Sequence, residues 1–466
     1  KGSLLQAMGI AYNELGKPEE GLRNLQEALA IRKKIGQQRG IAGSLDQIAQ
    51  VQDMLGNSSQ AWSSYQEALA VRRSIGDKRG IATTLLNLGS FLHDHGKYDE
   101  ALRYVPEALQ LFRELGDERN QALCLDNIGS IRFNRGEFQD ALTYFQQSYE
   151  IRDRLGLKTD MLDSLHNLGE TNVKLGQYDT ALSLYMKALE GERSLGNQSG
   201  IGLVSASLGS LFASQGRYGQ ALSAQKAALD AFQKVNDRSF NLVEAMAGYG
   251  NTLSMAGQAE EGQKTIEQAL KIGSDTKNER ILAAALNWLG DSYLYRGNYA
   301  AAQSQYERAM QAAAKAKVSE QVTVSKFALA RLDVMQGRPS AAIPVLRRLM
   351  QEADSTGLKA LSVQASICLA QGLLAVNKPE AAQDELDRAL NRSEKLGLLV
   401  ELARSHYVFG QVLTRLQKPR QATPQFQEAA RLLKTVAAAD GASRTLDRAD
   451  LKDMYREVAA DLLGGE

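Results

Sequence analysis

Apolar, small and polar positions recur along this chain with a period of 40 residues. One column sits inside an apolar stretch and contains only glycine or alanine: Gly9, Ala49, Gly89, Gly129, Gly169, Gly209, Gly250, Gly290, Ala330, Ala370 and Gly410. A second column follows seven residues later and is glycine from Gly16 to Gly337, then Asn377 and Gln417. The phase slips by one residue, between Gly216 and Gly257. This repetition predicts an array of similar units in which each unit contacts its neighbours.

Each period reads as two helices joined by a tight turn. In the second period, residues 41–55 are predicted as a first (A) helix, Gly56 opens the turn, and residues 59–75 form a second (B) helix that ends at Gly76. Glycine accepts the positive φ that such turns require. A proline column lies two residues past the turn, where the first turn of a helix has no amide bond to lose, at Pro18, Pro339, Pro379 and Pro419. The turn glycines and the helix-start prolines therefore place the helix ends where the 40-residue period places them.

The order of residue types within a period resembles the tetratricopeptide repeat (TPR). In the first period this order is Met8, Gly9, Tyr12, Gly16, Gly21, Leu25 and Ala28. The bulky column continues as Tyr65, Val105, Phe145, Tyr185, Ile266, Tyr306, Leu346, Leu386 and Phe426, with polar Gln225 as the exception. The period is longer than the usual TPR length, and the proline that closes the usual second helix is absent. A HEAT or armadillo array could share the period, but would not place glycine and alanine in these columns.

Long repeats of this type resemble those of Pins and LGN, kinesin light chain and bacterial Rap-like regulators. The resemblance implies an all-α fold, a right-handed superhelical α-solenoid of about 11 helix-turn-helix TPR repeats, with the A helices inside and the B helices outside. We expect the array at residues 1–440 as one continuous domain, with a one-residue insertion near 237–242. Residues 441–466 are expected to form a C-terminal solvating helix that caps the array.

Charge and composition narrow the classes of partner. The 466 residues carry 55 Lys and Arg against 54 Asp and Glu, a net charge of +1, which gives no general attraction to nucleic acid or to an anionic membrane. No apolar stretch is long enough to span a membrane, so we expect a soluble cytoplasmic protein. Cys124 and Cys368 are expected as small buried residues in a reducing compartment. The chain starts inside a repeat, at Lys1, which suggests a piece of a longer protein.

An unbroken run of amide side chains marks a candidate peptide-binding site. Two residues before the small column, repeats two to five carry Gln47, Asn87, Asn127 and Asn167. A carboxamide can bond both the N–H and the C=O of an extended peptide. Four such positions, each making two hydrogen bonds, contribute roughly 4 to 12 kcal/mol at about 0.5 to 1.5 per bond, against an association cost of about 4 to 15 kcal/mol. The alternative is that these amides bond the preceding helix or face water.

Because backbone bonds alone leave binding weak, neighbouring inner positions must supply affinity and selectivity. The candidates are Gln50, Asp53, Ser90, His93, Asp94, Asp126, Ser130, Asn134, His166 and Glu170. Acidic groups outnumber basic ones in this set, so a partner segment with Lys or Arg is favoured. In later repeats Trp288, Phe327, Ile367, Tyr407 and Val408 stand in inner columns. They either hold an apolar anchor of a partner or, as we favour, pack against the next A helix.

Sequence motifs for catalysis, cofactors or metals are missing. There is no phosphate-binding glycine loop, nucleophile elbow, CxxC pair or HExxH motif. His93, Asp94 and His95 are too close together on one helix to converge on a metal ion. We therefore predict a non-catalytic scaffold that binds a peptide or partner domain, without cofactor. The alternatives are a regulatory arm that binds a neighbouring domain of the same full-length chain, such as a kinase, cyclase, transcription regulator or caspase-like protease, and a peptide receptor of Rap type.

Overall fold

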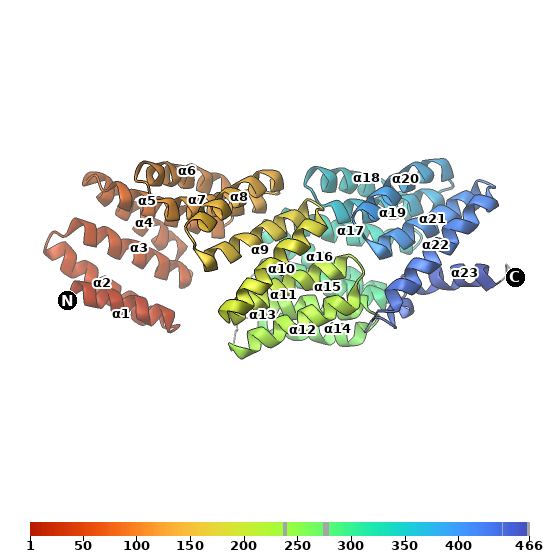
Figure 1. Cartoon of the computed structure of the whole chain (residues 1–466), viewed down its shortest axis with the longest axis horizontal. Coiled ribbons are helices and arrows are strands. Elements are labelled where there is room, and N and C mark those ends of the chain that lie inside the picture. The colour runs from red at the N-terminus through yellow and green to blue at the C-terminus, as the bar shows by residue number, and fades with distance from the viewer. Residues whose placement is uncertain (236–239, 274–278, 440, 464–466) are drawn as a thin grey trace. The chain divides into compact units, whose positions relative to one another are not determined.

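The computed structural model describes residues 1–235, 240–273, 279–439 and 441–463. Within these residues the chain is a series of helical hairpins without a strand (Figure 1). The prediction of an all-α solenoid is confirmed. Of the predicted insertion near 237–242, residues 237–239 lie outside the described part of the chain, and residues 240–242 are helical.

The A helices carry odd numbers and the B helices even numbers. The A helices are α1 (Gly2–Glu14), α3 (Gln38–Met54), α5 (Lys78–Asp94), α7 (Glu118–Asn134), α9 (Lys158–Lys174), α11 (Gln198–Ser214), α13 (Phe240–Met255), α15 (Glu279–Tyr295), α17 (Ser319–Met335), α19 (Lys359–Ala375) and α21 (Leu399–Arg415). The B helices are α2 (Pro18–Lys34), α4 (Ser58–Ser74), α6 (Tyr98–Glu114), α8 (Phe138–Arg154), α10 (Tyr178–Leu195), α12 (Tyr218–Lys234), α14 (Ala259–Gly273), α16 (Tyr299–Lys315), α18 (Pro339–Ser355), α20 (Pro379–Lys395) and α22 (Pro419–Ala437). A 3-10 turn, η2 (Thr445–Asp447), and α23 (Lys452–Leu463) follow.

Residues with a left-handed backbone conformation form the turns between A and B helices, as the second small column predicts. Gly56 has a φ of +78°, a value that costs a glycine little. Where the column changes residue type the conformation persists, with φ of +57° at Asn377 and +60° at Gln417. The column is therefore defined by a left-handed backbone conformation, which glycine adopts at the lowest cost and which other residues can also adopt.

Two compact units make up the chain, an N-terminal unit at Lys1–Ser164 and a C-terminal unit at Leu165–Glu466. Their boundary falls within α9. In the N-terminal unit, the largest buried cluster includes Tyr65, Leu88, Val105 and Phe112 from helices α4 to α6. In this unit α1, α3 and α5 each pack against their own B helix and against the A helix of the next repeat.

The C-terminal unit also brings together repeats that are distant in sequence. The ammonium group of Lys174, at the end of α9, lies 2.6 Å from a carboxylate oxygen of Glu320 near the start of α17. The backbone N–H of Leu399 donates to the carbonyl of Gln215, with an N···O distance of 3.4 Å. The ends of early A helices therefore meet the beginnings of A helices four to five repeats later.

Close approach of each A helix to its B helix explains the first small column. A Cβ placed on Gly250 of α13 would lie 2.7 Å from the carbonyl oxygen of Gly262 in α14 and 2.7 Å from Cγ1 of Ile266. A backbone oxygen cannot move aside as a flexible side chain can, so no larger residue fits without separating the helices.

We predict that Gly250→Ala lowers the free energy of unfolding by about 1 to 3 kcal/mol, because the added methyl group overpacks the α13–α14 contact. Gly248→Ala is the matched control in the same helix, since a Cβ there lies no closer than 3.7 Å to a neighbour. It should stabilise the protein by up to about 1 kcal/mol through helix propensity. Urea unfolding followed by circular dichroism measures both, and equal effects would contradict the packing argument.

Both cysteines are buried and free, as their sequence context predicts. Burial raises the pKa of the Cys124 and Cys368 thiols to about 12. At pH 8 the reactive thiolate is therefore scarce as well as covered.

We predict that neither thiol reacts rapidly with a disulfide reagent at pH 8 in the native protein, and that both react in denaturant. The absorbance of the thiolate that the reagent releases gives the number of thiols that have reacted. A fast native reaction of one equivalent would show that one of the two repeats opens locally.

Candidate functional site

The inner amide positions of the N-terminal unit differ in how they are bonded. Gln47, Asn87 and Asn127 are all half-buried on successive A helices, α3, α5 and α7. Oδ1 of Asn127 accepts a hydrogen bond from the Ser90 hydroxyl at 2.9 Å, which links α7 to α5. The side chains of Gln47 and Asn87 have no hydrogen-bond partner within the described part of the chain. The amide run therefore contains one structural cross-link and two open groups.

Polar contacts between neighbouring repeats continue at the ends of these A helices. Nε2 of His93 lies 2.7 Å from Nδ2 of Asn134, and Nδ1 of the same ring faces Asp94 at 3.2 Å. Nε2 of His95 instead lies 2.7 Å from Oδ1 of Asp53 on the preceding repeat. The two imidazoles thus serve different neighbours, as their spacing predicts.

The remaining predicted site residues lie in three environments. Gln50 is exposed, and Ser130 is half-buried on α7. Asn167 and Glu170 are half-buried on α9 but belong to the C-terminal unit, so the run of amides is divided between the two units.

Asp126 and His166 are core residues instead of surface residues. The Asp126 carboxylate forms an ion pair with Arg152, and burial raises the pKa of that carboxyl group to about 6. Nε2 of His166 lies 2.8 Å from the Ser207 hydroxyl, with its ring 5.7 Å from that of Tyr185. Both residues precede an amide position by one, and one residue rotates a helix by about 100°. That rotation turns Asp126 towards its own B helix and His166 towards the next repeat, so neither side chain lines the binding surface.

A buried arginine near the end of several B helices holds the next A helix. Nη2 of Arg72 lies 2.8 Å from Asp46, and its Nη1 donates to Thr84 at 2.7 Å and to the carbonyl of Gly80. Arg32 contacts Ser44 and Arg152 contacts Ser164 in the same columns. The intervening repeat replaces this arrangement with apolar Leu86, Phe112 and Cys124, which share one buried cluster. The sequence does carry a signal for this arrangement. A repeat with an acid in the first column has arginine in the second, and the repeat with leucine in the first has phenylalanine in the second.

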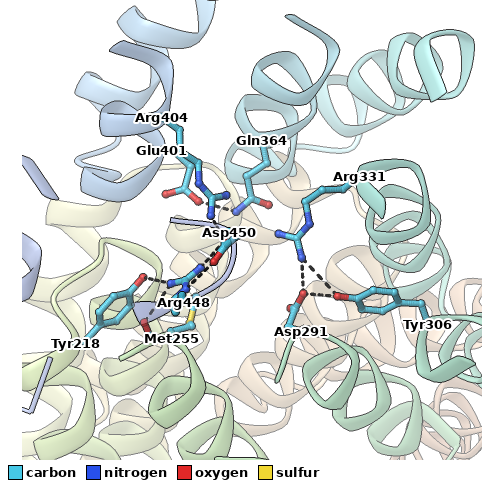
Figure 2. A network of polar contacts seen from close by, with 10 residues as sticks. All are labelled: Tyr218, Met255, Asp291, Tyr306, Arg331, Gln364, Glu401, Arg404, Arg448 and Asp450. Carbon is cyan, nitrogen blue, oxygen red and sulfur yellow. Dashed lines mark hydrogen bonds and ion pairs between the residues drawn. The ribbon is translucent and has the colours of Figure 1, made fainter. Parts of the chain in front are cut away.

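A second polar network occupies the C-terminal unit (Figure 2). Arg331 of α17 lies 2.6 Å from Oδ1 of Asp291 on α15, and that oxygen also accepts the Tyr306 hydroxyl at 2.7 Å. Gln364 of α19 donates to Glu401 of α21 at 2.9 Å. Arg404 of α21 is paired with Asp450, beyond the last B helix. Asp291 and Arg331 stand in the same column as Gln50 and Ser90, so a charge in that column was the missed signal.

The apolar inner residues of the later repeats have the contacts of core side chains. Phe327, Ile367, Tyr407 and Val408 are buried, and half-buried Trp288 packs against the cluster around Val243 and Leu289. Packing against adjacent helices, the interpretation that the sequence favours, therefore accounts for them.

Serial helical hairpins that pack on their neighbours define an α-solenoid. The chain belongs to the tetratricopeptide repeat family, whose model matches residues 2–74, 80–154, 121–194, 160–234 and 281–351. Among solved structures, aspartyl phosphate phosphatase F from Bacillus subtilis is similar, with 15% identity and a TM-score of 0.52 over 61% of this chain and 74% of that chain. At this identity the likeness concerns the fold. No curated protein sequence matches the chain. Among the described helices, none is long and apolar enough to cross a membrane.

We predict that Asp46→Asn costs about 3 to 5 kcal/mol of stability, because it leaves the buried Arg72 cation without its anion. Burial raises the pKa of Asp46 to about 6, so the measurement belongs at pH 8, where the carboxylate is ionised. Glu107→Gln, which breaks the exposed pair with Arg73, is the control and should cost less than about 1 kcal/mol.

The next repeat suggests a rescue of this loss. Asp46→Leu, Arg72→Phe and Thr84→Cys together copy Leu86, Phe112 and Cys124 and should restore stability to near the wild-type value. A triple variant as unstable as Asp46→Asn would show that the ion pair has a role that apolar packing cannot replace.

Proposed function

We propose that this chain is a non-catalytic scaffold that binds an extended segment of a partner protein along the A helices of its N-terminal unit. Tetratricopeptide repeats generally mediate protein–protein interaction, which supports the class of function. The observation that carries the proposal is the pair of half-buried carboxamides, Gln47 and Asn87, that lack partners within the described chain. The polar atoms of both amides stay open to solvent, so the backbone of an extended segment can reach them and satisfy both their donors and acceptors.

Neighbouring charges favour a basic partner segment. The carboxylate of Asp94 is 68% exposed, and that of Asp53 is partly exposed beside His95. Asp126 is paired inside the core and does not add to this field. A Lys or Arg side chain on the partner would therefore meet two carboxylates at the A-helix ends.

Catalysis is not part of this proposal, because the histidines are used in structural contacts. His93, His95 and His166 face Asn134, Asp53 and Ser207 respectively. Nδ1 of His406 lies 2.7 Å from Oε1 of Gln425. His166 alone lies beside a hydroxyl, that of Ser207, and no acid within the described residues holds its other ring nitrogen as an activated nucleophile requires.

We predict that peptides selected on the full chain from a phage-displayed library of random dodecapeptides lose at least about tenfold in affinity for the double variant Gln47→Ala with Asn87→Ala. Two or more hydrogen bonds, each contributing about 0.5 to 1.5 kcal/mol, are lost together. Isothermal calorimetry with the synthetic peptides measures the change.

The control replaces two exposed amides on the B helices, Gln110→Ala with Gln139→Ala, and should leave affinity unchanged. Enrichment of Lys and Arg among the selected peptides is also expected. Equal binding to both double variants, or a library that yields no binder, would contradict the proposal.

A further inference from the structure

Residues 441–451 leave the last B helix and lie against the ends of A helices from repeats seven and eight. Nε2 of Gln258 donates to the carbonyl of Gly441 at 2.9 Å, and the backbone N–H of Ala449 donates to the carbonyl of Tyr295 at 2.8 Å. We call residues 441–451 the C-terminal strap. Between these backbone contacts it has little regular structure, apart from the single turn of η2.

The turn glycine of repeat seven allows the strap to approach. A Cβ on Gly257 would collide with the carbonyl group of Arg444, and the φ of Gly257 is +86°. A side chain at this position would therefore hold the strap away from the helix ends. At Gly297, the corresponding glycine of repeat eight, a Cβ would lie 3.7 Å from that of Ala449, in ordinary contact.

Arg448 is the anchor of the strap. Its residue is only 3% exposed, and its guanidinium carbon lies 3.8 Å from the ring centroid of Tyr295. Nη1 donates to the carbonyl of Met255 at 3.1 Å and lies 3.4 Å from the hydroxyl of Tyr218 (Figure 2). The arginine thus fills a site built from an aromatic face, a phenol and a helix-terminal carbonyl.

Asp450 supplies the opposite charge two residues later. Its carboxylate lies 2.8 Å from Nη2 of Arg448 and also pairs with Arg404 of α21. Arg448 and Arg404 hold the pKa of this carboxyl group well below its usual range. By contrast, Arg444 and Asp447 of the same strap are 69% and 68% exposed and lie 3.7 Å apart.

Removal of the strap would leave a specific chemical requirement on the array. Arg404 keeps only 16% of its side chain exposed, and Asp450 is the anion paired with it. A mostly buried cation without its anion is costly. Tyr218, Tyr295 and the Met255 carbonyl would in turn lack the cation that they now contact. The surface therefore fits a cation and a carboxylate spaced two residues apart in a turn, because the backbone N–H of Leu451 donates to the carbonyl of Arg448 at 3.0 Å.

We propose that the C-terminal strap is an internal ligand of this surface, and that a partner protein carrying an exposed Arg-x-Asp or Arg-x-Glu segment binds there by displacing it. The tether gives the strap an effective concentration of about millimolar, so a free competitor binds the native chain weakly. A pocket of about 730 Å³ lies beside the strap, where a competitor can bind before the strap is displaced. Its lining includes Gln258, Lys264, Arg296, Arg444 and Asp447. This proposal uses the C-terminal unit and does not rest on peptide binding by the N-terminal unit.

The test uses the full chain and a labelled peptide with the sequence of residues 441–451. In the anchor variant, Arg448→Gln with Asp450→Asn, the strap loses both charged anchors while Tyr218, Tyr295 and Arg404 stay intact. We expect fluorescence anisotropy to show at least about 100-fold tighter binding of the peptide to the anchor variant than to the wild type. The control variant, Arg444→Gln with Asp447→Asn, changes the same residue types in the same strap and should bind like the wild type.

Two outcomes would overturn the proposal. One is an anchor variant with a wild-type circular dichroism spectrum that binds the peptide no better than the control variant. The other comes from the wild-type chain, which avoids any folding defect of the variant. Millimolar peptide should speed hydrogen–deuterium exchange within residues 441–451, whereas a peptide with Gln and Asn at the anchor positions should not, and equal exchange with both peptides contradicts displacement.

Discussion

The close contact between each A helix and its B helix is the constraint on which the rest of this structure depends. At Gly169, Gly290 and Gly410 an aromatic side chain from the B helix, Tyr185, Tyr306 or Phe426, occupies the space where a Cβ would stand. This contact sets the distance between the two helices and thereby directs the other A-helix positions towards the adjacent repeat or the inner surface. Both polar networks are built on positions that this packing orients.

Local features of the fold could be predicted from the sequence because they repeat and depend on neighbours in the chain. The turn at Gly56, the proline at the start of α18 and the burial of Cys124 follow from short-range rules of backbone geometry and size. The side-chain directions of Asp126 and His166 could not, since a shift of one position on a helix turns a polar group from the surface into the interface. Only the column of arginines 26 residues later would have shown that Asp126 has a partner.

The contacts of the C-terminal unit lie beyond such rules for a different reason. The approach of Leu399 to Gln215, and of Arg448 to Tyr218, depends on small rotations that accumulate over several repeats. A period fixes the repeat, but a modest error in the rotation between repeats changes which distant turns meet. Asp450 and Arg404 are unremarkable charges in the sequence, and their pairing becomes visible only when that rotation is known.

The buried contacts around Arg72 and Phe112, here called joints, are each divided between two repeats, which has a consequence for how this array can change over time. Asp46 and Arg72 belong to one repeat, and the Thr84 hydroxyl comes from the next. The apolar joint likewise takes Leu86 and Phe112 from one repeat and Cys124 from the next. Loss of residues 81–120 would therefore leave each acid beside its arginine and would change only the third residue, with Cys124 taking the place of Thr84 against Arg72. The charged pair is thus inherited as one unit with its repeat, and gain or loss of a whole repeat keeps the buried charge neutralised.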